Sequence, residues 1–182
     1  MLAEDGVERL ANLTVSTFLA RVASTEPTPG AGPVGALTLA MGIACALKAV
    51  AITAKHHAQR DPDIDRAAER LAAISEAARG GADSDAAMFG ELIASFRLPH
   101  ATAQAQEARG AAIHTAAAAV VEVAERLIQL SEEAAGLVAG FKDRIDPVMA
   151  GDVNTALRLI EANRLIQTDN LIENRRLLEA GR

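Results

Sequence analysis

The apolar positions of this chain recur about every three to four residues along most of its length, which is the spacing of helices. No stretch shows the alternation that is typical of a β-strand. Asp61 and Pro62 begin one helix that Gly80-Gly81 ends, and Pro33 stands in the first turn of another, where no N–H is needed. The expected helices cover residues 15–24, capped by Thr14, then 33–58, 62–79, 82–98, about 100–145 and about 152–179, with a break near Gly110 left open.

Composition favours closely packed helices in one domain over residues 1–182. Half of the 182 residues are apolar, yet the chain has no Trp or Tyr and only four Phe, so alanine supplies much of the apolar surface. Alanine is the best helix former and lets backbones approach. We therefore expect an all-α bundle of about five to six helices. The apolar surface of these helices is larger than a monomer of this length readily buries, which predicts a homodimer built on the long helices.

The segment AGPVGALTLAMGIACALKAVAITA, residues 31–54, is apolar all round the helix. Such a helix is either the buried centre of a bundle or a membrane span. Lys48 interrupts it, many of its positions are Ala or Gly, and no second candidate span exists. These features favour a buried central helix and no membrane association.

Charge and cysteine content exclude several classes of protein. The net charge of −6, with no basic cluster interleaved with aromatic residues, argues against nucleic-acid binding. Cys45 is alone, which excludes a disulfide framework, and the N-terminus does not resemble a signal peptide, so we expect a reducing, cytoplasmic location. No metal site is expected, because the histidines lack metal-binding spacing: His56, His57, His100 and His114.

The stretch PTPGAGP, residues 27–33, places rigid prolines beside glycines just ahead of the most apolar helix. Free N–H groups at a helix start suit an anion or a polarised oxygen, and the glycines Gly30 and Gly32 would let a ligand approach the backbone closely. An ordinary stiff turn is the alternative interpretation.

A row of amides runs down the apolar face of the last helix. At 100° per residue, Asn163, Gln167, Asn170 and Asn174 fall within one narrow arc that also includes Asp152. Buried amides require hydrogen-bond partners. The row therefore has two interpretations. The amides pair with one another across a helix interface or with those of a symmetry mate, or they bind a polar ligand with many donors and acceptors.

Asp85 lies on the apolar face of the expected helix 82–98. It shares that face with Phe89, Leu92 and Phe96 at spacings i+4, i+7 and i+11. As a first-turn residue it would stabilise the helix dipole. The alternative is a catalytic acid or base at the edge of a pocket.

Taken together, these stretches resemble the cyclodeaminase/cyclohydrolase family, which includes the C-terminal domain of formiminotransferase-cyclodeaminase and the bacterial methenyltetrahydrofolate cyclohydrolases. FLARVASTEPTPGAGPVGAL, residues 18–37, is similar to the family's FL..LAS..PTPGGGS.AAL. DAAMFGELIASFRLPH, residues 85–100, and DPVMAGDVNTA, residues 146–156, resemble two further family motifs, and Asn170 and Asn174 match a spaced asparagine pair. The resemblance covers about residues 14–178.

The resemblance implies an all-helical homodimer that binds a tetrahydrofolate derivative and needs no further cofactor. Asp85 would be the base or proton shuttle, and Asn170 and Asn174 would bind the pterin ring. Arg97 and Lys48 would bind the folate carboxylates. Backbone donors would come from the loop between Gly30 and Gly32.

Two reactions and one non-catalytic role are consistent with this resemblance. The reactions are hydration of 5,10-methenyltetrahydrofolate to 10-formyltetrahydrofolate, and loss of ammonia from 5-formiminotetrahydrofolate. A formiminotransferase domain on the same chain would favour the second; the sequence shows none, so we expect the cyclohydrolase. Pro33 replaces the family's serine and His100 its lysine, changes that suit an altered substrate or a non-catalytic binding protein.

Overall fold

The computed structural model describes residues 8–57 and 61–180, which form α-helices and short 3-10 helices and contain no strand. This confirms the all-α prediction. The elements are η1 Leu10–Asn12, α1 Val15–Val22, α2 Ala31–His56, α3 Pro62–Phe96, α4 Ala103–Phe141, η2 Lys142–Arg144, η3 Pro147–Met149 and α5 Ala150–Ala180.

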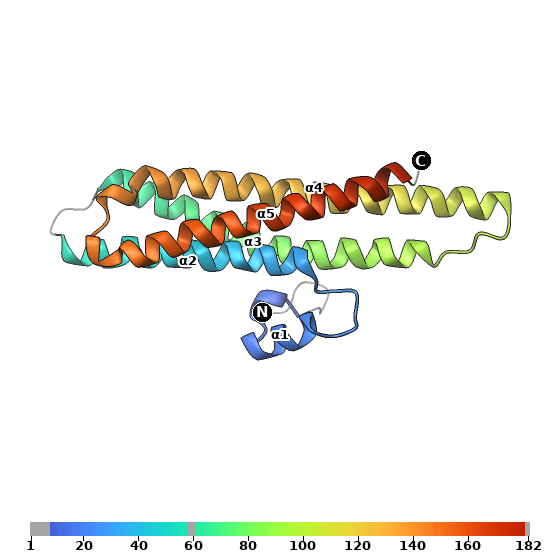
Figure 1. Ribbon diagram of the computed structural model, residues 1–182, viewed down its shortest axis with the longest axis horizontal. Coiled ribbons are helices and arrows are strands. Elements are labelled where there is room, and N and C mark those ends of the chain that lie inside the picture. Colours follow the sequence, from blue (N-terminus) through green and yellow to red (C-terminus); the bar gives the residue numbers. More distant parts are fainter. Residues whose placement is uncertain (1–7, 58–60, 181–182) are drawn as a thin grey trace.

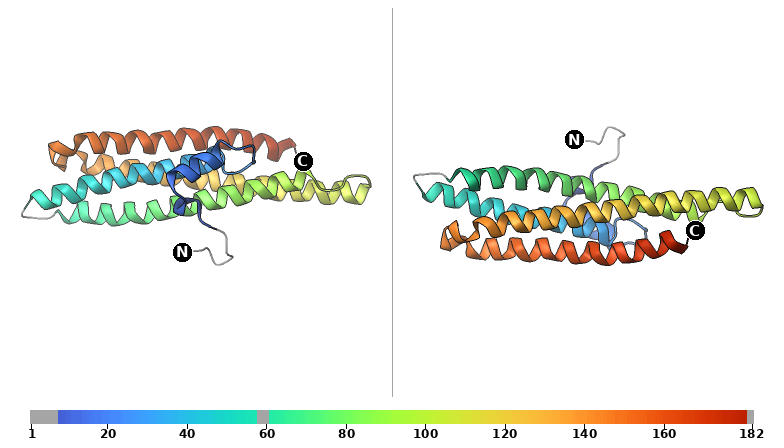
Figure 2. Two further views of the ribbon diagram at one scale, coloured as in Figure 1. Left: turned by 90° about the horizontal axis from the view of Figure 1, so that it is seen from below. Right: turned by 90° about the horizontal axis from the view of Figure 1, so that it is seen from above.

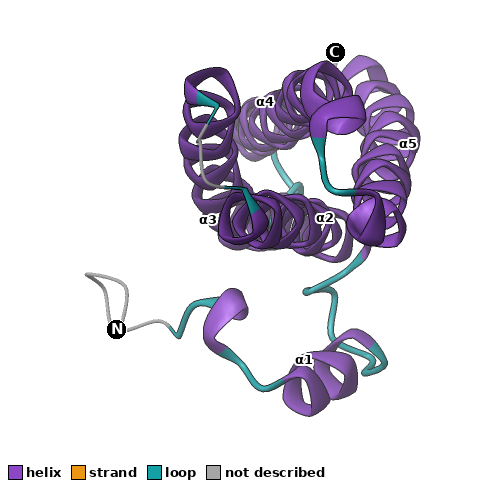
Figure 3. Cartoon of the chain, turned by 90° about the vertical axis from the view of Figure 1, so that its left-hand side faces the viewer, coloured by secondary structure: helices purple, strands orange, loops and turns teal. Residues whose placement is uncertain are grey.

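Helices α2 to α5 form an elongated four-helix bundle (Figure 1). α2 and α4 each pack against α3 and α5, so α2 and α4 lie diagonally opposite one another. α1 lies outside the bundle, on the side of α2, as the end-on view shows (Figure 3). Its N-cap is Thr14, whose hydroxyl accepts a hydrogen bond from the Thr17 N–H, as the sequence predicted.

α2 is the core helix of the bundle. Ala36, Leu39, Ile43, Ala46 and Ala49 are completely buried against its neighbours. α2 is also long and apolar enough to cross a membrane, a property that a core helix shares with a true span. Its packing between α3 and α5 confirms a core helix, but not one buried all round, because Met41 and Lys48 lie on an exposed outer face. The expected end at residue 58 lies outside the described residues.

The break predicted at Gly80-Gly81 does not occur, because α3 runs without interruption from Pro62 to Phe96. A Cβ on Gly81 would lie 2.8 Å from Leu127 Cδ2, so this glycine makes room for a buried leucine of α4. Such packing outweighs the roughly 1 kcal/mol by which glycine disfavours a helix. α4 is likewise continuous through Gly110. Asp85 therefore lies deep within a helix, and its interpretation as a first-turn carboxylate is wrong.

α2 is the shortest helix of the bundle and begins about half-way along it, as two further views show (Figure 2). Beyond this point α3, α4 and α5 continue together around a second apolar cluster that includes Leu92, Ile113 and Val120. Phe89 and Leu177 are only partly buried against that cluster. The first turn of α2 thus faces the three other helices with Gly32 and Pro33, whereas Ala31 is exposed, and this is where the candidate site lies.

Candidate functional site

The first turn of α2 presents backbone N–H groups without a capping side chain. Its N-cap is Gly30, and the first hydrogen bond of the helix runs from the Val34 N–H to the Gly30 carbonyl at 3.2 Å. Pro33 is the third helical residue and has no N–H to donate, as its predicted first-turn place requires. The N–H groups of Ala31 and Gly32 remain at the positive end of the helix dipole.

The carboxyl group of Asp85 lies directly against Gly32. Gly32 in α2 and Asp85 in α3 are each about 24 residues from the turn that joins the two helices, so the antiparallel pair brings them to the same level. A Cβ on Gly32 would lie 2.2 Å from Asp85 Oδ1 and 2.3 Å from Oδ2. Only glycine at position 32 leaves room for this carboxyl group.

Asp85 is a buried acid with unusual protonation chemistry. Its side chain is 8% exposed, and no residue in the described ranges 8–57 and 61–180 donates a hydrogen bond to it. Burial raises the pKa of its carboxyl group to about 6, because the charged form loses its hydration. A carboxyl group with this pKa can accept and return a proton near neutral pH.

The amides of α5 reach the same place from the opposite side. Gln167 Nε2 donates to the Gly32 carbonyl at 2.9 Å and to Asn163 Oδ1 at 3.1 Å, and both amide side chains are completely buried. Asn170 Nδ2 donates to Gln167 Oε1 at 3.3 Å. Asn163 Nδ2 in turn donates to Ser131 Oγ of α4 at 2.7 Å.

A second glycine of α2 admits these amides. A Cβ on Gly35 would lie 2.7 Å from Asn163 Oδ1 and 2.8 Å from Gln167 Nε2. The predicted row of amides is therefore satisfied mainly within the chain, which supports the first of its two interpretations. Asn174 differs, because it is 8% exposed and its side chain makes no hydrogen bond within the described ranges.

The structure groups some of the predicted site residues and separates others. Asp85 contacts Gly32, Gln167 links Gly32 to Asn170, and Asn174 follows one helical turn later. Gln167 was not among the predicted site residues; its place in the amide row was the signal, but its bond to the Gly32 carbonyl depends on helix packing that the row does not encode.

Two predicted cations lie away from this group. Lys48 is 16 residues beyond Gly32, roughly 24 Å along α2, where its amine pairs with Asp152 at 3.1 Å and its side chain is 63% exposed. Asp152 therefore also lies away from the amide cluster. Arg97 caps the C-terminus of α3, is exposed, and lies roughly 18 Å along the helix from Asp85.

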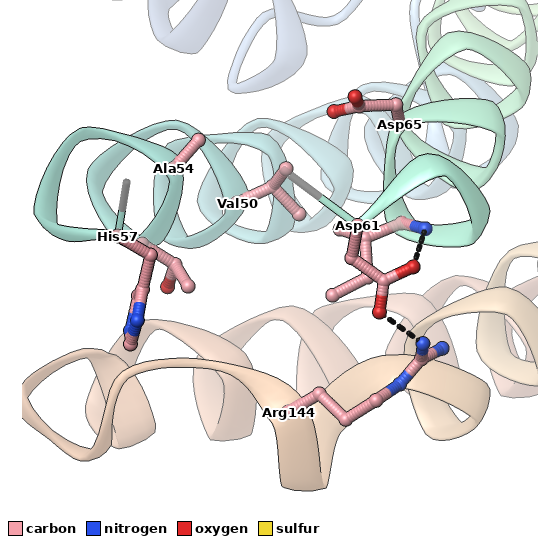
Figure 4. Close-up of a pocket in the computed structure, with 8 residues that line it drawn as sticks. Val50, Ala54, His57, Asp61, Asp65 and Arg144 are labelled. Atoms are coloured by element: carbon pink, nitrogen blue, oxygen red, sulfur yellow. Dashed lines mark hydrogen bonds and ion pairs between the residues drawn. The ribbon is translucent and has the colours of Figure 1, made fainter. Parts of the chain in front are cut away.

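Two cavities lie outside this group of residues, one of them next to it. One of about 170 Å³ is at the α2–α3 turn, lined by Val50, His57 and Arg144, where Asp61 caps α3 and pairs with Arg144 (Figure 4). The other, of about 580 Å³, lies between the N-terminal segment and the outer face of α3 and is also lined by Thr28 and Pro29, so it borders the start of α2. Its arginines are already paired with carboxylates: Arg9 with Glu76 and Asp83, and Arg21 with Glu8. Both cavities contain ion pairs that join elements of the chain.

Comparison with known proteins places this arrangement in a family. Residues 14–172 match the family model described as formiminotransferase-cyclodeaminase. The chain is 29% identical, over 114 residues, to a methenyltetrahydrofolate cyclohydrolase of Methylorubrum extorquens; the match covers 62% of this chain and 55% of that protein. The chain thus spans little more than half the length of this curated relative.

A solved structure shares the fold. It is the crystal structure of formiminotetrahydrofolate cyclodeaminase from Thermotoga maritima, which superposes with a TM-score of 0.80 at 20% identity. The superposition covers 94% of this chain and 89% of that one. The family model extends over most of the described residues, from the cap of α1 into the last turns of α5, and includes both Gly32 and Asp85. This chain therefore belongs to the formiminotransferase-cyclodeaminase family.

Proposed function

We propose that this protein is an enzyme of folate one-carbon metabolism that hydrates 5,10-methenyltetrahydrofolate to 10-formyltetrahydrofolate. One observation carries the proposal: a buried carboxyl group, Asp85, lies against the open first turn of α2 and has a pKa of about 6. Membership of the family and the name of the cyclohydrolase relative support this choice of substrate.

The proposed reaction needs one group that moves a proton. The carbon of the methenyl bridge is electrophilic, and the Asp85 carboxylate takes a proton from water as the water oxygen bonds to that carbon. The resulting carbinolamine collapses when its C–N5 bond breaks and the Asp85 carboxyl group protonates N5. The second water proton leaves to solvent as the formyl C=O forms on N10. The N–H groups of Ala31 and Gly32 are the proposed donors to the developing alkoxide.

Substrate binding is assigned to the remaining groups near the start of α2. Asn170 and Asn174 are proposed to bind the pterin ring, whose edge carries several donors and acceptors. Arg97 is proposed to bind a carboxylate of the folate tail, which is long enough to extend along α3. We assign no such role to Lys48 within the same chain, because Asp152 already neutralises it at the distant end of α2.

Cyclodeamination is the second candidate, favoured by the fold shared with formiminotetrahydrofolate cyclodeaminase. That reaction closes the methenyl bridge as N10 attacks the formimino carbon and ammonia leaves, so the same carboxyl group would protonate the departing nitrogen. The purified protein should be assayed with each substrate separately. Turnover of methenyltetrahydrofolate without release of ammonia from formiminotetrahydrofolate supports the hydration.

The decisive variant is Asp85→Asn, with Asp63→Asn as its control because Asp63 is an exposed aspartate at the far end of the same helix. Loss of the proton-transfer group should lower turnover of methenyltetrahydrofolate by roughly 10²–10⁴-fold, while the control keeps wild-type turnover. If Asp85→Asn retains turnover within a few-fold of wild type, Asp85 is not the proton shuttle.

We further propose that the protein is a cytoplasmic homodimer. Val15 and Leu19 of α1 and Met41 of α2 are 75%, 59% and 55% exposed, and such apolar residues are well suited to be covered by a second copy. Light scattering at micromolar concentration should give about twice the chain mass. A mass near 18.9 kDa contradicts the dimer.

A further inference from the structure

The side chain of Gln167 is tied to three groups at once, although it lies behind the site rather than in it. It is completely buried on α5. Its NH₂ group donates to the Gly32 carbonyl and to Asn163, and its carbonyl oxygen accepts from Asn170. A buried amide with three such bonds has only one satisfied orientation.

The Gly32 carbonyl sets the direction of this amide chain at one end. A carbonyl oxygen only accepts, so the NH₂ group of Gln167 must face it and the Gln167 oxygen must face Asn170. The NH₂ group of Asn170 then has to point toward Gln167. Any reversal of Gln167 would bring two oxygens together at Gly32.

A second backbone carbonyl sets the direction at the other end. Ser131 Oγ donates to the Leu127 carbonyl at 3.1 Å, so it accepts the 2.7 Å hydrogen bond from the NH₂ group of Asn163. Asn163 also approaches the Leu127 carbonyl through that NH₂ group, at 3.4 Å. Its oxygen must therefore face Gln167, which agrees with the direction that Gly32 imposes.

This fixed direction decides what Asn170 can offer to a ligand. One of its NH₂ hydrogens is committed to Gln167, whereas its carbonyl oxygen accepts no hydrogen bond within residues 8–57 and 61–180. Asn170 is partly exposed, and the Asp85 carboxyl group lies on the other side of Gly32. When Asp85 is ionised, both groups are acceptors.

We propose that Gln167 is a positioning residue which, supported by Asn163 and Ser131, presents the carbonyl oxygen of Asn170 to an N–H donor of the substrate. The proposal rests on the proposed function, in which that donor belongs to the pterin ring. Gln167 itself does not touch the substrate; it acts through Asn170.

The test is a double-mutant cycle measured on methenyltetrahydrofolate. Gln167→Met keeps the length of the side chain and removes its amide, and Asn170→Ala removes the group that Gln167 orients. Each single variant should raise KM about tenfold, because one hydrogen bond to the substrate is lost, and should leave kcat within about threefold of the wild-type value. The double variant should lie within about threefold of either single variant, because Gln167 acts through Asn170.

Multiplicative effects on KM, about 100-fold in the double variant, would overturn the proposal. Ile160→Val is the matched control on α5: it trims another fully buried side chain, lowers stability and should leave KM unchanged. If Gln167→Met does not fold, Ser131→Ala removes the far end of the amide chain and should raise KM in the same direction by a smaller factor. An unchanged KM in Ser131→Ala then refutes the proposal.

A readout without folate separates this proposal from the proposed function. The side-chain amide hydrogen of Asn170 that is bonded to Gln167 should exchange with solvent in Gln167→Met at least tenfold faster than in the wild type and in Ile160→Val. Faster exchange in a protein that neither binds nor turns over a folate supports the positioning role and overturns only the proposed function. Equal exchange in Gln167→Met and the wild type overturns the positioning role itself.

Discussion

Asp85 makes the protein less stable at the pH at which its proposed chemistry operates. Burial raises the pKa of its carboxyl group from an ordinary 3.8 to about 6. Each pH unit between these values corresponds to about 1.4 kcal/mol, so ionised Asp85 lowers the free energy of unfolding by about 3 kcal/mol. Asp85→Asn keeps the shape of the neutral acid and removes this penalty.

The sign follows from proton binding in the two states. Between pH 3.8 and about 6 the folded protein holds a proton on Asp85 that the unfolded chain has released. The contribution of neutral Asp85 to stability is complete below pH 3.8 and is lost as the pH rises through about 6. The free energy of unfolding of Asp85→Asn should therefore rise relative to that of the wild type between pH 3.8 and about 6, and the difference should stay constant at higher pH.

Urea denaturation of the wild type and of Asp85→Asn at one protein concentration, from pH 4 to pH 8, measures the difference in their free energies of unfolding. Other titrating groups are common to both chains and cancel. The gain of Asp85→Asn relative to its own value at pH 4 should reach about 2.4 kcal/mol by pH 7, because part of the penalty is already present at pH 4. A stability difference that does not change with pH, or one that favours the wild type increasingly at higher pH, refutes the buried-acid account of Asp85.

Three further outcomes follow from the same geometry. In the wild type, kcat/KM for methenyltetrahydrofolate should fall as the pH drops below about 6, because Asp85 is then protonated and cannot act as the base; a flat profile from pH 5 to 8 argues against that role. Gly35→Ala should lower the free energy of unfolding by roughly 1–3 kcal/mol, since its Cβ would lie 2.7 Å from Asn163 Oδ1. Gly80→Ala, whose Cβ would meet nothing within 4 Å, should instead raise it by roughly 0.5–1 kcal/mol, and thermal denaturation of both variants beside the wild type tests the contrast.

The helical fold could be predicted because its signals are local. The caps at Thr14 and Asp61 and the first-turn prolines Pro33 and Pro62 act within one turn of helix, and the structure confirms them. The continuation of α3 through Gly80-Gly81 could not be predicted. A glycine pair disfavours a helix by its intrinsic propensity, but within a packed bundle it can also make room for a neighbouring side chain. Only the position of Leu127 on α4 distinguishes the two.

The residues of the site, and their gathering around one ligand, could be predicted from the sequence, but the contacts between them could not. Asp85 and the amides were recognisable because polar groups on apolar helix faces need partners. The contact of Asp85 with Gly32 depends on the register of two antiparallel helices, and the assumed break at Gly80-Gly81 concealed that register. Lys48 was assigned to the folate carboxylates as the cation within the apolar helix, and its partner Asp152 is set by the same long-range packing.

The amide chain described above crosses the whole bundle. It begins at Ser131 on α4, passes through α5, reaches Gly32 on α2 and there meets Asp85 of α3. Separating α4 from α5, or α5 from α2, breaks hydrogen bonds of this chain, and separating α2 from α3 removes the contact of Asp85 with Gly32, so the centre of the bundle belongs to one cooperative unit. Backbone amides around Gln167 should accordingly exchange their hydrogens only through global unfolding, and heating should abolish activity and helical structure in a single transition.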